Sequence, residues 1–298
     1  DLTARTDSDV GEVVAQLTAT GWSGTWTADV ARRIAEDSGD HVVSAGFSQL
    51  TLADVMPSLA SSAAAEIPLY GNVRVVVDDR GMRDATLNLD VGAGVLDFGT
   101  PDEAVLLDEA SFHARWDGAA GEIVVEPSSL HFGPTSGSFT GVIRDEGSGR
   151  MMFAFESGDA TLAARDTGEP PLAVQQLEIA GSTDIASRVL DVDRVVIQTE
   201  DGTFAGAFRL GFTGETPSLS AAAELTPMDI ATWKRMWPPF LAPGARRWAL
   251  DNIAGGRIAS ARFEAAVPAG ELFRTEPPSI EKDALRLDLR LEDVTVST

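Results

Sequence analysis

The sequence of 298 residues contains no cysteine. This absence excludes disulfide scaffolds, thiolate metal sites and cysteine nucleophiles together. Runs of 18 or more apolar residues are also lacking, so neither a transmembrane helix nor a secretory signal is predicted within these residues. Because the chain starts without Met in strand-like sequence, we expect it to be part of a longer protein whose targeting segment lies upstream.

Basic residues are few. There are 23 Lys and Arg against 46 Asp and Glu, which gives a formal net charge of −23. Such a charge opposes binding to nucleic-acid phosphates and to anionic membrane surfaces. We therefore expect no nucleic-acid partner, and we interpret the acidic balance as a solubilising surface rather than as a cation site.

Motifs that carry catalysis or phosphate binding are lacking as well. There is no His-Glu-x-x-His, nucleophile elbow, P-loop or dinucleotide fingerprint. The three histidines, His41, His113 and His131, lie far apart, and the last two occupy polar positions of alternating segments. We expect no catalytic residue, metal site or cofactor, and no enzyme. A glycan-active β-protein remains an alternative, because its paired carboxylates would meet only in three dimensions.

The chain is rich in apolar–polar alternation with a period of two, which is typical of antiparallel strands with one apolar face. Residues 73–77 and 85–91 alternate on either side of an Asp79-Arg80-Gly81 turn, and the same pattern recurs in 110–116 and strictly in 285–291. About a dozen such strands fit a sandwich, a closed sheet or a long curled sheet. Two short helical inserts cannot cover a sheet of about 60 Å at 4.8 Å per strand. Either the sheet folds over itself or an apolar ligand occupies it.

The longest segment without this alternation is 226–257, which holds three of the six tryptophans. Thr226 and Asp229 predict a capped helix start, and Pro238-Pro239 predicts its end. A second helix is expected from Pro243 to Ile253, with Trp248 and Leu250 for burial and Gly255-Gly256 as its stop. Helix-on-sheet packing is the expected role of Trp233, Trp237 and Trp248.

A shorter copy of this unit occurs near the start. Residues 50–56 repeat the pattern Leu-Thr, two residues, Asp, aliphatic, and they predict a capped helix over 51–65. Further upstream we expect strands within 12–27 and 41–50, with a short helix over 28–36. Since a catalytic device needs no copy that lacks every tryptophan, the repeated unit is interpreted as a module junction.

The residues of the junction also carry a family resemblance. Met236-Trp237-Pro238, then 241–248 (LAPGARRW), Asn252-Ile253 and Gly255-Gly256 resemble a segment typical of AsmA-like envelope proteins, the group that includes TamB and YhdP. Residues 52–57, 68–71 and 92–94 look like the YhdP-like branch, and the resemblance covers most of the chain from about residue 45.

The resemblance implies a mainly β fold: a long antiparallel, taco-like curled sheet with an apolar concave groove and two short helical inserts. It implies a periplasmic segment of a protein anchored in the inner membrane by an N-terminal helix that these residues lack. The expected function is to bind phospholipid acyl chains and support lipid transport to the outer membrane. Expected partners are phospholipid, neighbouring modules of the same chain, and membrane proteins at either end. A non-transport scaffold or assembly module for outer-membrane biogenesis is the alternative.

On this basis we divide the chain into 1–46, the end of a preceding module; 47–223, a capped helix and long β-meander; and 224–298, the Trp/Pro/Arg insert with further strands. The candidate groove residues are the large apolar side chains of the alternating segments: Leu87, Leu89, Val91, Phe112, Trp116, Ile123, Val125, Leu130, Phe132, Phe139, Phe153, Phe155, Phe204, Phe208, Leu210 and Phe212.

Overall fold

The structure is a computed structural model, and it describes residues 2–7, 12–20, 25–55, 66–96, 105–147, 149–163, 168–213, 217–237, 243–271 and 284–296. The protein is mainly β, with 69% of its described residues in strands. Nineteen strands belong to a large antiparallel sheet, and the other four of the described strands form the pairs β7–β8 and β20–β23. The mainly β fold that the resemblance implies, a large antiparallel sheet with short helical inserts, is confirmed. The chain divides into two compact units, which meet in sequence at residues 133 and 134.

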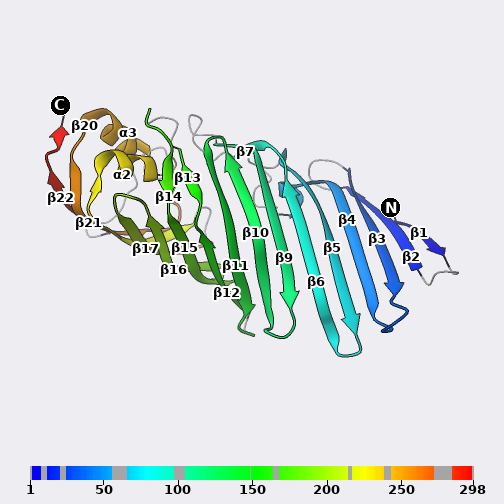
Figure 1. Ribbon diagram of the computed structural model, residues 1–298. Coiled ribbons are helices and arrows are strands. Elements are labelled where there is room, and N and C mark those ends of the chain that lie inside the picture. The colour runs from blue at the N-terminus through cyan, green and yellow to red at the C-terminus, as the bar shows by residue number, and fades with distance from the viewer. Residues whose placement is uncertain are drawn as a thin grey trace. The chain divides into compact units, whose positions relative to one another are not determined.

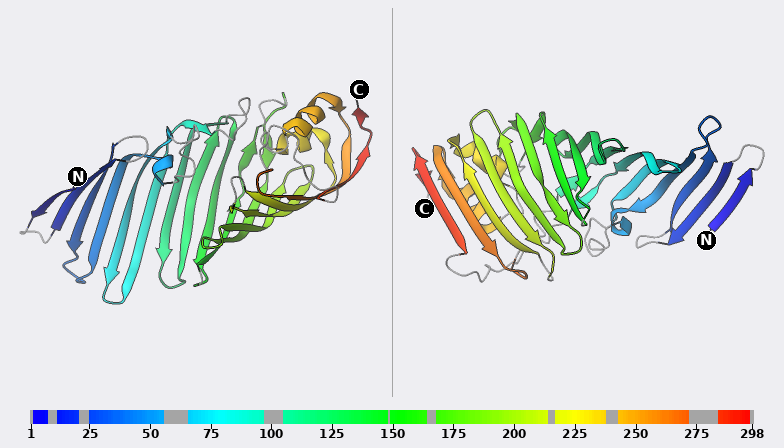
Figure 2. Two further views of the ribbon diagram at one scale, coloured as in Figure 1. Left: turned by 180° about the vertical axis from the view of Figure 1, so that it is seen from behind. Right: turned by 90° about the horizontal axis from the view of Figure 1, so that it is seen from below.

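The first unit is an antiparallel meander in which each long strand pairs with the next one (Figures 1 and 2). Its elements are β1 (Leu2–Asp7), β2 (Glu12–Thr20), β3 (Thr25–Ile34), β4 (His41–Thr51), α1 (Leu52–Val55), β5 (Pro68–Asp78), β6 (Gly81–Val91), β7 (Gly94–Leu96), β8 (Val105–Leu107), β9 (Glu109–Asp117) and β10 (Glu122–Phe132).

The long strands of the second unit also pair antiparallel with their neighbours, and this unit adds a helical insert that consists of α2 and α3 (Figure 1). Its elements are β11 (Thr135–Asp145), β12 (Arg150–Ser157), β13 (Ala160–Leu162), β14 (Leu172–Val174), β15 (Gln176–Asp184), β16 (Val189–Gln198), β17 (Thr203–Gly211), β18 (Ser218–Leu225), β19 (Met228–Asp229), α2 (Ile230–Met236), α3 (Pro243–Asn252), β20 (Ile253–Ala254), β21 (Arg257–Val267), β22 (Leu285–Glu292) and β23 (Thr295–Val296).

Two helix predictions need correction. The helix expected over 28–36 is wrong, because residues 25–34 form β3, a strand paired on both sides. Its apolar residues fit either period, and pairing with β2 and β4 decides for the strand. The helix expected over 51–65 is seen only as α1, and residues 56–65 lie outside the described part of the chain. Its cap is as predicted: the Thr51 N–H and hydroxyl donate to Asp54 Oδ2 at 3.0 and 2.8 Å.

The second cap differs from the prediction. Asp229 is the N-cap residue of α2 but makes no capping hydrogen bond, and it pairs instead with Arg257 at 2.8 Å. The Thr226 hydroxyl accepts a hydrogen bond from the Thr203 N–H at 2.7 Å, which ties the end of β18 to β17. Helix α3 spans the predicted residues, and Gly255 and Gly256 follow it with φ of 64° and 87°, the left-handed region that favours glycine.

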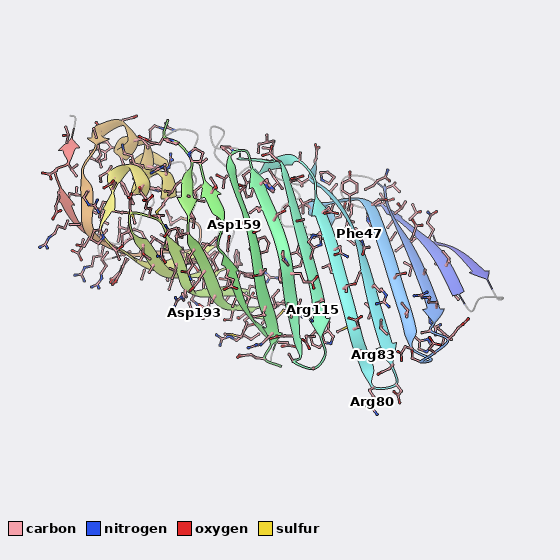
Figure 3. All side chains as sticks on the ribbon, viewed as in Figure 1. Phe47, Arg80, Arg83, Arg115, Asp159 and Asp193 are labelled. Carbon is pink, nitrogen blue, oxygen red and sulfur yellow. The ribbon has the colours of Figure 1, made fainter. Side chains whose placement is uncertain are left out.

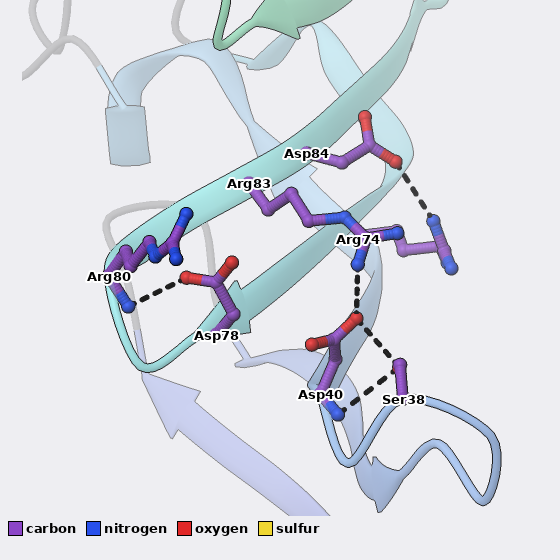
Figure 4. Close-up of polar contacts among 7 residues, drawn as sticks. All are labelled: Ser38, Asp40, Arg74, Asp78, Arg80, Arg83 and Asp84. Atoms are coloured by element: carbon purple, nitrogen blue, oxygen red, sulfur yellow. Dashed lines mark hydrogen bonds and ion pairs between the residues drawn. The ribbon is translucent and has the colours of Figure 1, made fainter.

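Hairpin ends in the first unit are held by polar contacts. Asp40 is buried, with 8% exposure, and accepts hydrogen bonds from Arg83 at 2.6 Å and Ser38 at 2.7 Å (Figure 4). Arg74 pairs with Asp84 at 3.3 Å, and the Arg80 N–H donates to Asp78 at 2.8 Å within the β5–β6 turn. A buried carboxylate is tolerated here because two donors compensate its lost hydration.

Candidate functional site

In the first unit the strand register places apolar side chains opposite one another from β2 to β10. Directly opposed residues of antiparallel strands point to the same face, so these pairs define one surface. On β6, for example, Leu87 faces Ala114 and Leu89 faces Phe112. We call this surface the first apolar face: Ala15, Leu17, Ala28, Val30, Val43, Ala45, Phe47, Val73, Val75, Ala85, Leu87, Leu89, Val91, Ala110, Phe112, Ala114, Trp116, Ile123, Val125 and Leu130.

The second unit repeats the arrangement. Phe155 faces Ile179, and Val192 faces Phe208. The resulting second apolar face comprises Ile143, Met151, Phe153, Phe155, Leu177, Ile179, Leu190, Val192, Val195, Ile197, Phe204, Phe208, Leu210, Leu219, Ala221, Ala223, Leu225, Ile258, Ala261, Phe263, Ala265, Val267, Leu285, Leu287, Leu289 and Leu291.

One end of the first apolar face is covered by described residues, and Ala114 and Val125 of the same face are also buried, with 5% and 1% exposure. Ile67 and Leu107 are almost fully buried and pack with Leu52, Val91, Ala110 and Phe132. Beyond this cluster most large side chains of the face, from Leu87 to Ile123, remain half-buried, neither in a closed core nor fully exposed. The first unit therefore presents apolar surface that its described residues do not cover.

Helices α2 and α3 cover one end of the second apolar face (Figures 1 and 2). Ile230 and Ala249 pack with Ile258 and Ala261 from β21, and Leu225, Trp233, Trp237 and Val294 surround this core. The ring centroids of Trp233 and Trp237 lie 4.9 Å apart. Outside this core, Phe153, Phe155, Phe208 and Leu210 of the same face are only half-buried.

Polar contacts hold the helical insert in this position. The Thr232 hydroxyl donates to Asp201, and Arg235 donates to the Pro170 carbonyl at 3.0 Å. Lys234 Nζ donates to the carbonyls of Leu250 and Ile253 at 3.2 and 2.5 Å, where α3 ends. Burial lowers the pKa of Lys234 despite nearby Asp251 and Glu169. These contacts make the insert a fixed cover over one end of the face.

Trp248 does not take part in this packing. Its side chain is 54% exposed, so the prediction that it is buried is wrong. The buried residues of α3 are instead Arg246 and Ala249. Arg246 Nε donates to the Trp237 carbonyl at 2.9 Å and so joins the two helices. Trp248 is expected to be buried from the sequence because it is large and apolar. In the structure α3 instead turns the face that carries Arg246 and Ala249 toward the protein.

The candidate groove residues fall on these two faces. Leu87, Leu89, Val91, Phe112, Trp116, Ile123, Val125 and Leu130 belong to the first, and Phe153, Phe155, Phe204, Phe208 and Leu210 belong to the second. Phe132 packs in the covered cluster, and Phe139 makes an edge contact with Phe155 at 6.1 Å. Phe212 follows β17 and is 45% exposed. Phe47, Val73, Val75 and Phe263 also lie on these faces but are missing from the candidate groove residues, although the same alternation in sequence predicts them.

The opposite faces of both units are polar and carry ion pairs between neighbouring strands. Arg115 lies 3.4 Å from Glu126, Arg194 lies 2.7 Å from Glu178, and Arg209 lies 3.3 Å from Asp191. Figure 3 shows side chains such as Arg115 and Asp193 on their strands. Contact with Glu224 raises the pKa of Arg262. Exposed pairs of this kind set strand register and solubility more than stability.

The described residues contain no cluster of three or more His, Cys, Asp or Glu that could hold a metal. His113 bonds Asn88 at 2.9 Å, and His131 lies 3.6 Å from Glu109, in both cases on the polar face. An open depression of about 430 Å³ holds a single carboxylate, Glu156, beside Ser138, Phe139, Thr140, Ser157, Gly158, Gln175 and Gln176.

Comparison with known families, with characterised proteins and with solved structures found no match for this chain. Among the described residues no helix is both long and apolar enough to cross a membrane.

Proposed function

We propose that this protein binds the acyl chains of phospholipids along its apolar faces and so supports lipid transport between membranes. The observation that carries the proposal is that directly opposed apolar side chains recur from strand to strand and that most of the large ones are only half-buried beyond the covered ends. Water-soluble proteins expose few contiguous apolar patches of this kind unless a ligand or partner covers them.

The chemistry of the two faces suits an amphipathic ligand. Each buried methylene contributes about 0.8 kcal/mol, so an acyl chain gains affinity from length alone and needs no specific polar contact. The zwitterionic or anionic head group stays in water at the strand ends. The acidic surface, with a net charge of −23, opposes adsorption of the protein to anionic bilayers. Lipid binding would therefore come from the apolar faces rather than from charge.

We further propose a periplasmic location, as part of an inner-membrane-anchored protein that carries phospholipid toward the outer membrane. The resemblance of 236–256 to AsmA-like envelope proteins supports this location. The fixed insert formed by α2 and α3 fits a brace at the junction of two modules, because it covers one end of the second apolar face and leaves the other end uncovered.

The test is organic extraction of the purified chain after expression in Gram-negative cells, followed by mass spectrometry of the extract. We expect co-purified phospholipid. Phe112→Asp and Phe208→Asp, one on each apolar face, are expected to lower the lipid recovered per mole of protein at least about fivefold, since a charge in the path of the acyl chains must be desolvated.

Matched controls lie on the polar faces. Thr86→Asp falls between Arg74 and Arg115, and Ser220→Asp faces Arg209, so both add the same charge in a favourable place. We expect both controls to retain lipid. Lipid-free wild-type protein, or equal loss in the controls, would contradict the proposal. A scaffold that functions without lipid would keep its cellular activity in folded Phe112→Asp, which distinguishes that alternative.

A further inference from the structure

Strand β22 is an exposed edge. All eight of its residues are exposed, and among the described residues it pairs only with β21. Its leucines, which continue the second apolar face, are exposed by 49% at Leu285, 60% at Leu287, 40% at Leu289 and 37% at Leu291. An exposed edge strand with an apolar face is a template for pairing with another strand.

The hydrogen-bond pattern between β21 and β22 determines which backbone groups of β22 point away from β21. The Ala266 N–H donates to the Ala284 carbonyl at 2.7 Å, so 266 and 284 form a hydrogen-bonded pair of the antiparallel ladder. Since such pairs alternate along antiparallel strands, the even residues of β22 up to Asp288 direct their backbone groups toward β21. The odd residues, which are the leucines, direct their N–H and C=O groups outward.

The polar face of β22 carries charges of alternating sign, Arg286, Asp288, Arg290 and Glu292. In the register with β21, Arg286 lies opposite Glu264, Asp288 opposite Arg262 and Glu292 opposite Arg257, and within β22 the Arg286 side chain lies 3.1 Å from Asp288. About Leu289 the order is antisymmetric, because each cation has an anion at the same distance on the other side. A strand with this order is complementary to itself when it is reversed.

We propose that two copies of this chain associate through antiparallel pairing of β22 with β22, centred on Leu289. In this register Arg286 faces Glu292 of the partner copy and Asp288 faces its Arg290, and the two-fold axis repeats both pairs. Leu287 faces Leu291, and the outward backbone groups of the leucines form the hydrogen bonds. The two second apolar faces then continue into one another.

The charges also select this register over its neighbours. A shift that centres the pairing on Asp288 brings Asp288 against itself and Arg286 against Arg290. A shift that centres it on Arg290 brings Arg290 against itself and Asp288 against Glu292. Like charges directly opposed across strands are destabilising, so both shifts are disfavoured. Four opposite-charge contacts and a continuous leucine row favour the centre at Leu289.

The experiment is sedimentation velocity of the 298-residue chain over a concentration series, with two reciprocal variants. Asp288→Arg places Arg against Arg290 of the partner copy, and Arg290→Asp places Asp against its Asp288. The dimer dissociation constant of each variant alone should therefore be at least about tenfold above that of the wild type. Mixed together, the two variants restore opposite charges at both positions. We therefore expect a heterodimer in the mixture and monomers in each separate sample.

Asp193→Arg is the control for the charge change, because Asp193 is exposed on β16 and away from the β22 edge. It should dimerise as wild type does. If a variant of the first pair misfolds by circular dichroism, Arg286→Glu and Glu292→Arg form a second reciprocal pair with the same logic. A wild-type chain that stays monomeric at the highest concentrations, or a mixture that stays monomeric while both variants are folded, overturns the proposal.

Discussion

The ring of Phe47 lies over Gly71, its directly opposed partner on the neighbouring strand. A Cβ atom added at Gly71 would lie 2.7 Å from Cζ of Phe47. The same relationship recurs in the second unit, where the ring of Phe155 occupies the space above Gly141. In both pairs the glycine has no side chain, so the aromatic ring of the opposite residue fills the space above it. The ring thereby continues the apolar surface across the glycine.

The first prediction concerns this packing. Gly71→Ala should destabilise the protein by about 1–3 kcal/mol, because the methyl group overpacks against the Phe47 ring and neighbouring backbone. Gly46→Ala is the matched control: it lies one residue from Phe47 on the polar face, and its nearest neighbour would be the Gly71 carbonyl oxygen at 4.0 Å. Urea unfolding monitored by circular dichroism measures both. Equal destabilisation by the two substitutions would contradict the packing argument.

The second prediction separates two tryptophans of the insert. Trp237→Ala should lower the free energy of unfolding by about 2–4 kcal/mol, since its ring packs on Trp233 and on the core that joins α2, α3 and β21. Trp248→Ala should change it by less than about 1 kcal/mol, because the Trp248 side chain is 54% exposed. Thermal unfolding of the two variants provides the measurement. If Trp248→Ala proves the more damaging, the placement of α3 is wrong.

The third prediction concerns acid. Hydrogen bonds from the Ala120 and Ala119 backbone N–H groups lower the pKa of Asp117, and those from Ser187 and Ala186 lower the pKa of Asp184. A lowered folded-state pKa gives stability that is present above the unfolded value, about 3.8, and is lost as pH falls through the folded value.

The double variant Asp117→Ala/Asp184→Ala should therefore melt below wild type at pH 7, and the difference should shrink steadily between about pH 5 and pH 2. Melting temperatures across this range test the sign. Asp193→Ala, which removes an exposed carboxylate on β16, serves as the control for the loss of a surface charge. A gap that widens in acid would refute the assignment.

Strand patterns could be predicted because each long strand has one apolar and one polar face. In residues 219–225 the alternation in sequence is also an alternation of exposure, with Ser220, Ala222 and Glu224 exposed and the residues between them half-buried. Register followed from the same pattern, since a slip of one residue would move every leucine to the polar side. The module boundaries at 46/47 and 223/224 remain a prediction.

Tertiary pairing decided what the sequence left ambiguous. Residues 28–34 read equally as a helix, and only their position between β2 and β4 selects the strand. Thr51 and Thr226 stand in the same local motif, yet one caps α1 and the other bonds to β17, because a neighbouring strand offers Thr226 the Thr203 N–H. The extent of the cover over the second apolar face likewise depends on where α2 and α3 pack, which no local pattern encodes.

The last prediction uses a tryptophan that the protein itself supplies on the proposed lipid path. Trp116 belongs to the first apolar face, opposite Ala85 and Ile123. Phospholipids with brominated acyl chains should quench its fluorescence, because bromine quenches an indole only in close contact. Trp233 and Trp237 pack against the core of the helical insert, where we expect no acyl chain. Trp116→Phe, which conserves apolar bulk, should therefore remove a larger share of the quenching than Trp233→Phe.

Head-group position can be separated from chain position in the same experiment. Lipid brominated on the acyl chain and lipid carrying a quencher on the head group have equal access to an exposed indole such as Trp248, but only the former reaches an indole on the sheet face. A Trp116 signal that responds equally to both probes would indicate adsorption of whole lipid to the protein surface. A response restricted to the acyl-chain probe would place the hydrocarbon on the first apolar face, because water at the strand ends retains the charged head group.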